Sequence, residues 1–91
     1  MAEASFVKDP SAVLDYIIDW TDWLDDDTIS TSSWTIPSGL TAAYADTNNT
    51  TTATVWLSGG TAGTNYSVIN HITTAANRED DRTLKIKVRQ K

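Results

Sequence analysis

The stretch from residue 63 to residue 90, GTNYSVINHITTAANREDDRTLKIKVRQ, decides the fold class of this chain. Apolar side chains alternate with polar ones on both sides of a polar turn, and this period of two is typical of half-buried β-strands. The residues that share one face are Tyr66, Val68, Asn70, Ile72, Leu84, Ile86 and Val88. Between the two halves, Asn77 can adopt a positive φ more easily than most residues. We therefore predict a β-hairpin with its loop at residues 75–81.

The same alternation continues N-terminal to this hairpin. Thr, Val, Ile, Tyr and Trp recur between clusters of Gly, Asn, Asp and Ser, which is the pattern of short strands joined by turns. The further predicted strands are residues 12–20, 28–37, 38–46 and 52–60. Together these segments predict an all-β, Ig-like antiparallel β-sandwich of about six or seven strands.

Several positions within these strands carry more specific predictions. The apolar phase changes between Ile29 and Trp34, which predicts a β-bulge. Tyr66 lies two residues before an inward apolar position, as in the tyrosine corner of Greek-key sandwiches. Trp56 is expected on the opposite side of its strand from its two inward-facing neighbours. The sets predicted to share a face are Leu14, Tyr16, Ile18 and Trp20; Leu40, Ala42 and Tyr44; and Val55 with Leu57.

The N-terminal third leaves one alternative open. Residues 1–10 are predicted to form a flexible arm, and residues 11–91 a single sandwich domain. Residues 11–20 are expected to form a strand because of their β-branched residues. However, Pro10 is also suited to the first turn of a helix, and Leu14, Ile17, Ile18 and Trp20 partly fit helical spacing.

Composition and charge argue against several classes of function. The chain has 91 residues, 40% of them hydrophobic, and no cysteine, so disulfides and thiolate metal sites are excluded. A net charge of -5 opposes binding to phosphate backbones or anionic lipids. The sequence also has no basic, apolar signal-peptide start and no apolar run of membrane-spanning length. We predict neither nucleic-acid nor membrane binding.

No motif points to catalysis or to a bound cofactor. His71 is the only histidine, and it has no ligand-spaced partner histidine. The run of Asp25, Asp26 and Asp27 lacks the spacing of a calcium loop. Residues 58–63, SGGTAG, are glycine-rich but lack the G-K-[ST] ending of a phosphate loop. We therefore predict no catalytic residues, no cofactor and no metal.

The charges are distributed unevenly along the chain. Acidic residues gather in residues 15–27, and five of the seven basic residues lie in the last ten positions. If the first and last strands are neighbours, Asp15 and Asp19 can face Lys85 and Lys87 within one sheet. The alternative is that the same complementarity operates between adjacent copies of the chain. The sequence alone leaves both open.

An ordered series of motifs spans almost the entire chain, from residue 8 to residue 89. The motifs are D-W-x-D-W-L, D-T-I-S, S-x-W-T-[IV]-P-S-G-L, V-W-L-S-G-G-T-A-G-T-x-Y and T-T-A-A-x-R. In this order they resemble the fiber-tail adaptor family of tailed bacteriophages. One departure is Asn77, which stands where such sequences commonly carry glycine in the last motif, and asparagine tolerates the same turn.

The resemblance implies an Ig-like β-sandwich that is a non-enzymatic structural protein of the virion, made in the cytoplasm of the bacterial host. Its implied partners are other virion proteins of the tail, fiber, portal or capsid, and it is expected in several symmetric copies. We expect an adaptor that joins the tail to a fiber or another tail component. The alternatives are a capsid decoration protein and, from a different class, a carbohydrate-binding module suggested by four tryptophans.

The segment DWTDWLDDDT, residues 19–28, has two interpretations. In the first, Trp20, Trp23 and Leu24 close one end of the sandwich, and the aspartates keep that end soluble. In the second, an exposed Trp23 among polar groups is an interface hot spot. The arm and the loops at 22–28, 45–51 and 75–81 are the expected contact regions. The candidate partner contacts are Phe6, Asp22, Trp23, Leu24, Asp25, Asp26, Trp56 and Arg78.

Overall fold

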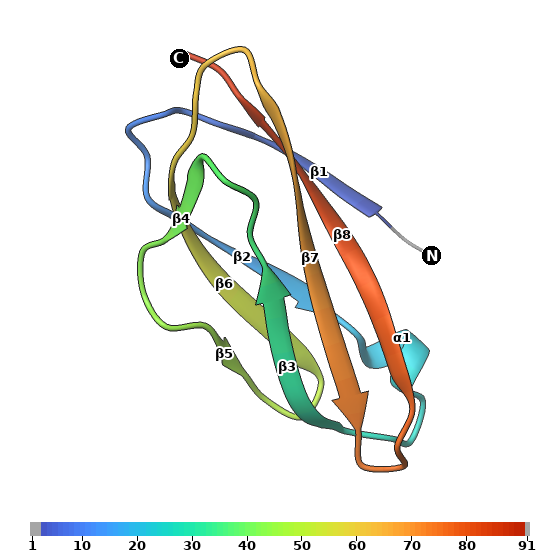
Figure 1. Cartoon of the computed structure of the whole chain (residues 1–91). Helices are drawn as coiled ribbons and strands as arrows, with labels where there is room; N and C mark the ends of the chain where they lie inside the picture. Colours follow the sequence, from blue (N-terminus) through green and yellow to red (C-terminus); the bar gives the residue numbers. More distant parts are fainter. Residues whose placement is uncertain (1–2, 91) are drawn as a thin grey trace.

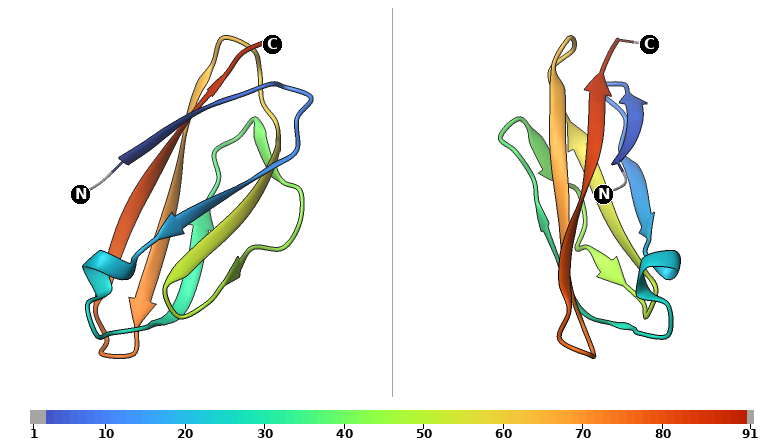
Figure 2. Two further views of the ribbon diagram at one scale, coloured as in Figure 1. Left: turned by 180° about the vertical axis from the view of Figure 1, so that it is seen from behind. Right: turned by 90° about the vertical axis from the view of Figure 1, so that its right-hand side faces the viewer.

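The computed structural model describes residues 3–90 and consists of two β-sheets packed face to face (Figures 1 and 2). Sheet A has the strand order β1-β8-β7-β3, and sheet B has the order β2-β6-β4 with β5 also paired to β6. The elements are β1 (Glu3–Lys8), β2 (Leu14–Asp19), α1 (Thr21–Leu24), β3 (Ile29–Thr35), β4 (Leu40–Ala42), β5 (Thr47–Asn48), β6 (Thr52–Gly59), β7 (Asn65–Thr74) and β8 (Glu79–Val88). The predicted all-β sandwich is confirmed, although the strand count is eight, because β1 and β5 were not expected.

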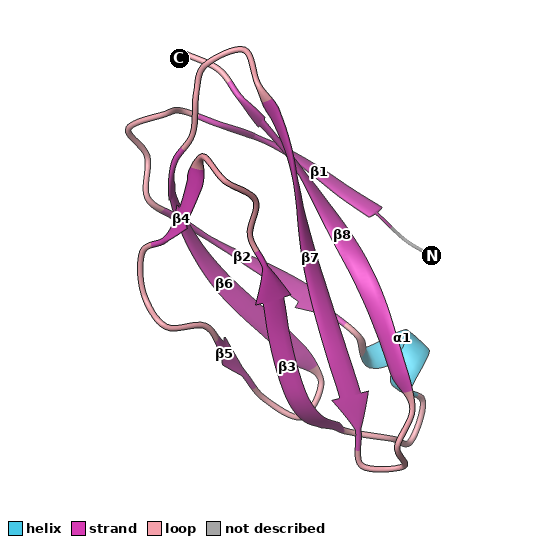
Figure 3. Cartoon of the chain, viewed as in Figure 1, coloured by secondary structure: helices cyan, strands magenta, loops and turns pink. Residues whose placement is uncertain are grey.

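The predicted hairpin is the longest feature of sheet A. Strands β7 and β8 have ten residues each and pair antiparallel from Asn65 opposite Lys87 to Thr73 opposite Glu79. Asn77 in the connecting turn has a φ of 68°, as predicted. The turn is shorter than residues 75–81, because β8 already begins at Glu79 (Figure 3).

The core lies between the inward faces of the two sheets. The buried hydrophobic residues that form it are Tyr16, Ile18, Trp20, Leu24, Ile29, Leu40, Val55, Leu57, Tyr66, Val68, Ile72, Leu84, Ile86 and Val88. Leu14 shares their face but is 40% exposed because β2 is the edge strand of sheet B. Tyr44 was predicted to share the face of Leu40, and this is wrong. Strand β4 ends at Ala42, and Tyr44 lies 62% exposed against Trp56.

The segment after Pro10 is a strand followed at once by one helical turn. Strand β2 ends where the Asp19 carboxylate accepts a hydrogen bond from the backbone N–H of Thr21 at 2.9 Å, and α1 begins. Strand β2 pairs with β6, so Asp15 lies opposite Trp56. The hypothesis that Asp15 and Asp19 face the lysines of β8 across one sheet is therefore wrong.

Residues 3–8 are a strand where the sequence predicted an arm. Strand β1 pairs parallel with β8, placing Phe6 opposite Ile86 and Val7 opposite Lys87. The Phe6 ring lies 4.9 Å from the Tyr16 ring, and Lys8 is fully buried with its ammonium donating to the Gly59 carbonyl at 2.7 Å. These contacts connect β1 to strands β2 and β6 of sheet B. Residues 1, 2 and 91 of the predicted arm and domain lie outside the described residues.

Two local predictions are confirmed. The β3 register shifts between Ile29 and Thr31, as expected for a bulge. The Tyr66 hydroxyl accepts a hydrogen bond from the backbone N–H of Thr61 at 3.0 Å, which is the geometry of a tyrosine corner. A Cβ at Gly39, whose φ is 105°, would come within 2.8 Å of that hydroxyl, so the corner requires glycine there. Within residues 3–90, no helix is long and apolar enough to span a membrane.

Candidate functional site

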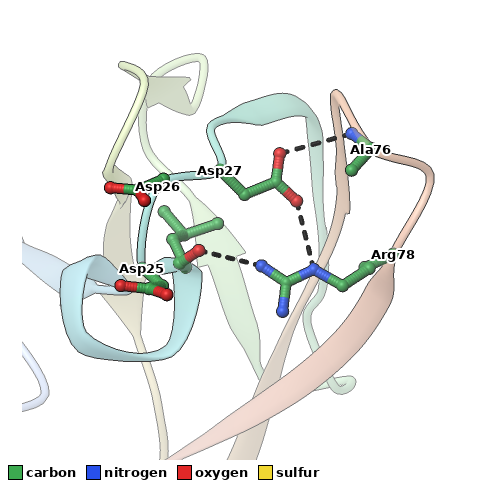
Figure 4. Close-up of a pocket in the computed structure, with 6 residues that line it drawn as sticks. Asp25, Asp26, Asp27, Ala76 and Arg78 are labelled. Atoms are coloured by element: carbon green, nitrogen blue, oxygen red, sulfur yellow. Dashed lines mark hydrogen bonds and ion pairs between the residues drawn. The ribbon is translucent and has the colours of Figure 1, made fainter.

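One end of the sandwich gathers most of the predicted contact residues. There α1, the loop that follows it and the β7–β8 turn meet, at the end opposite the C-terminus (Figure 1). A shallow pocket at this end is lined by Leu24, Asp25, Asp26, Asp27, Ala76 and Arg78 (Figure 4). We call residues 21–28 together with residues 75–78 the acidic end.

An ion pair between Asp27 and Arg78 fastens the two loops of the acidic end together. Oδ2 of Asp27 accepts from Nε of Arg78 at 3.1 Å, and Nη2 of Arg78 donates to the Leu24 carbonyl at 2.9 Å (Figure 4). Oδ1 of Asp27 also accepts from the backbone N–H groups of Thr28 at 2.8 Å and Ala76 at 3.3 Å. Segments about fifty residues apart in sequence are thus held in one fixed arrangement.

The environment of Asp27 keeps its carboxylate ionised. Hydrogen bonds, first from the Thr74 side chain and then from Thr28, Arg78 and Ala76, lower the pKa of Asp27 to about 2. Its side chain is only 10% exposed, whereas that of Arg78 is 45% exposed. The pair therefore stays charged at neutral pH, and Arg78 still presents part of its guanidinium to solvent.

Two tryptophans and two arginines form a continuous stack beside this ion pair. The Arg78 guanidinium lies 4.5 Å from the Trp23 ring centroid, and the Arg82 guanidinium lies 4.3 Å from that of Trp20. The two indole rings meet edge to face at 5.3 Å and 70°. Guanidinium groups at such distances are attracted to the negative face of an aromatic ring. The stack runs from Arg78 through both indoles to Arg82, which also donates to the Asp19 carbonyl at 2.8 Å.

Trp20, the more deeply buried of these two tryptophans, is held by a hydrogen-bond network. Nε1 of Trp20 donates to Oδ1 of Asn70 at 2.9 Å, and both residues are fully buried. The Asn70 amide in turn donates to the Ser32 hydroxyl and the Ser33 carbonyl, each at 2.9 Å. Because Asn70 lies on β7, the serines on β3 and Trp20 directly after β2, one amide connects the two sheets.

This geometry favours the first interpretation of the DWTDWLDDDT segment. Trp20 and Leu24 are 0% and 1% exposed, and Trp23 is partly buried against the core. Asp22, Asp25 and Asp26 are exposed at the same end. The apolar side chains of the segment point inward and close the sandwich, and Asp22, Asp25 and Asp26 point outward.

The eight predicted contact residues are brought together only in part. Six of them lie at the acidic end, where Leu24 is buried and the others have exposed or partly exposed side chains. Phe6 lies instead on β1 against Tyr16, and Trp56 lies on the outer face of sheet B against Tyr44, with ring centroids 5.4 Å apart. Trp23 and Trp56 are both partly buried.

Within the described residues, the exposed acids Asp22, Asp25 and Asp26 differ from Asp27 in having no basic partner. Figure 4 draws no interaction between Arg78 and the carboxylates of Asp25 and Asp26, and no ion pair within residues 3–90 involves them or Asp22. Asp25 has a φ of 58°, which turns the chain sharply out of α1. In the described part of the chain, no group of three or more metal-ligating side chains is present. The acidic end thus offers unpaired negative charge on a rigid base.

Sequence reasoning missed three residues that build this end: Asp27, Asn70 and Arg82. Asn70 gave a signal, because it stands between Val68 and Ile72 on the apolar face of its strand, and buried amides need hydrogen-bond partners. The roles of Asp27 and Arg82 depend on contacts across the fold, and nothing in their local sequence distinguishes them.

Comparison with protein families confirms the resemblance seen in the sequence motifs. The family model described as podophage GP4 fiber-tail adaptor protein gp77 matches residues 8–87. The match includes the helix and every strand except β1, of which only Lys8 is included, and the last residue of β8. A search of curated proteins finds no match.

Proposed function

Since this chain belongs to the podophage fiber-tail adaptor family, we propose that it joins the phage tail to a fiber or to another tail component through protein-protein contacts, and that it does so without catalysis. The family match over residues 8–87 is the observation that carries this proposal, and it supports a structural role in the tail of the virion. The rigid sandwich suits such a role, because a connector must hold its contact surfaces in fixed relative positions.

The acidic end is the proposed contact surface for the partner. Its loops are fixed by Arg78, which bonds both Asp27 and the Leu24 carbonyl, so little conformational entropy is lost on binding. Asp25 and Asp26 are exposed and form no ion pair within residues 3–90, and the potential they create favours a partner surface rich in Lys and Arg. The partly exposed indole of Trp23 adds apolar area beside these charges.

The surroundings of the only histidine support a non-catalytic role. Nδ1 of His71 contacts the Asp81 carboxylate at 2.5 Å, and Nε2 contacts the Glu79 carboxylate at 2.9 Å. Both ring nitrogens are therefore engaged with acids, whereas a general base must leave one nitrogen for a nucleophile. In this arrangement the imidazole links β7 to β8.

The proposal is tested with phage particles assembled on variants of this chain. The acidic-end variant is Asp25→Asn with Asp26→Asn, and the matched control is Asp46→Asn with Asp80→Asn, which removes the same charge elsewhere. Fibers per particle are counted by electron microscopy and by quantitative mass spectrometry. We expect the acidic-end variant to lose fiber or tail-component occupancy, with about a tenfold weaker contact for each ~1.4 kcal/mol lost. Equal occupancy in both variants would exclude the acidic end as the contact.

A further inference from the structure

Two lysines of sheet A have no acidic residue directly opposite them on the neighbouring strands. Lys85 and Lys87 are exposed on the outer face of β8. Their cross-strand neighbours are uncharged on both sides: Ser5 and Ser67 flank Lys85, and Val7 and Asn65 flank Lys87. The only polar contact of these ammonium groups is from Lys85 to the Ser67 hydroxyl at 3.1 Å, within residues 3–90. The positive charge of this face is therefore directed to solvent.

The outer face of sheet B has the opposite character. Asp15 is exposed and lies opposite Trp56, with no basic residue beside it on β6. Around it the same face exposes apolar side chains: Val13 is 47% exposed, Ile17 is 56% exposed and Tyr44 is 62% exposed. Isolated exposed apolar residues are ordinary, but a group of them around one charge marks an interaction surface.

We define two surfaces from these observations. The Asp15 face consists of Val13, Asp15, Ile17, Tyr44 and Trp56 on sheet B. The lysine face consists of Val7, Ser67, Lys85 and Lys87 on sheet A. Since sheet A lies in front of sheet B in Figure 1 and behind it in the reverse view of Figure 2, the two surfaces point away from each other.

Asp15 could pair with Lys85 and Lys87 either within one chain or between two chains, and the fold excludes the first. Pairing within a chain is impossible, because β2 and β8 belong to different sheets and the charges lie on opposite outer surfaces. Pairing between molecules remains. We propose that copies of this chain associate face to face, with the Asp15 face of one copy seated on the lysine face of the next.

Charge and apolarity both favour a second copy as the occupant. Asp15 can approach Lys85 and Lys87 of the neighbour, while Ile17 can pack against the exposed Val7. Because the two surfaces differ, the contact is heterologous, and each copy keeps one free face on which the next copy can add. The acidic end is not covered by this contact, so the self-association is independent of the proposed partner binding.

The test uses sedimentation of the purified chain at increasing concentration and low salt. We expect the wild type to form oligomers, and we expect Asp15→Lys and Lys87→Glu each to raise the dissociation constant about tenfold or more. Asp26→Lys, the same charge change at the acidic end, is the control and retains the association. Unchanged melting temperatures verify that the exposed substitutions leave the fold intact.

Mixing the two variants makes the test specific to these surfaces. In an equimolar mixture, the lysine introduced by Asp15→Lys can pair with the glutamate introduced by Lys87→Glu. The unchanged Asp15 face of the second variant still fits the unchanged lysine face of the first, so association recovers. A wild type that stays monomeric to millimolar concentration would overturn the proposal. Variants that associate like the wild type, or a mixture that fails to recover, would also overturn it. None of these outcomes bears on fiber occupancy in particles.

Discussion

Replacing Asn70 with alanine removes a fully buried side chain whose hydrogen bonds connect the two sheets. Asn70 is fully buried, accepts from the Trp20 indole and donates to Ser32 and Ser33, all at 2.9 Å. In Asn70→Ala the fully buried Trp20 indole N–H loses its partner in the interior, whereas Ser33 is exposed and its carbonyl can bond to water. A buried polar group without a partner costs ~1–3 kcal/mol. We therefore expect a loss of about 1–3 kcal/mol in the free energy of unfolding.

That loss is large for a chain of this size. At ~0.05–0.15 kcal/mol per residue, a domain of this length is stable by only about 5–14 kcal/mol. A fall of at least about 4 °C in melting temperature follows from ~4–8 °C per kcal/mol for small domains. Thermal unfolding followed by tryptophan fluorescence measures it, because Trp20 reports directly on the lost bond.

The matched control is Asn65→Ala, at the exposed start of the same strand. It should change the unfolding free energy by no more than ~0.5 kcal/mol. If Asn70→Ala behaves like this control, the hydrogen bonds of Asn70 do not stabilise the packing of the two sheets.

Three further changes probe the same end of the sandwich and the β7–β8 hairpin. Leu24→Ala, at a 1% exposed position, should lower the unfolding free energy by ~2–5 kcal/mol in urea titrations, and a change below 1 kcal/mol would contradict the closing role of Leu24. Asp27 has its pKa lowered from 3.8 to about 2, so its contribution to stability is present above the unfolded pKa and is lost as the pH falls through the folded pKa. Asp27→Asn should flatten the acid limb of a stability profile, and an unchanged limb would contradict this. Asp81 first, and then Glu79, raise the pKa of His71 above 6.5, so its contribution is complete below 6.5 and is lost as the pH rises through the raised pKa. His71→Gln should remove that loss, and a profile identical to the wild type would count against the pairing.

Alternation along the chain predicts the hairpin and the core because each strand buries one face and exposes the other. The inward sets on β6, β7 and β8 follow directly from a period of two. The bulge after Ile29 and the positive φ of Asn77 are also local, since they arise from neighbouring residues.

What the pattern misses depends on residues far apart in sequence. Strand β1 pairs with β8 about eighty residues later, and no local feature of residues 3–8 indicates this partner. The Asp27–Arg78 pair likewise joins two loops that meet only after both sheets have formed. The placement of β2 beside β6 decides which charges can meet, and this placement separates Asp15 from the lysines of β8.

The central claim, a structural role at the phage tail, is tested most directly by counting molecules. Quantitative mass spectrometry of purified particles gives the copy number of this chain relative to the portal ring and the major capsid protein. A structural role at the tail predicts a copy number on the scale of the portal ring, as for an adaptor. A copy number on the scale of the capsid shell would point to capsid decoration, and absence from particles would contradict the virion role altogether.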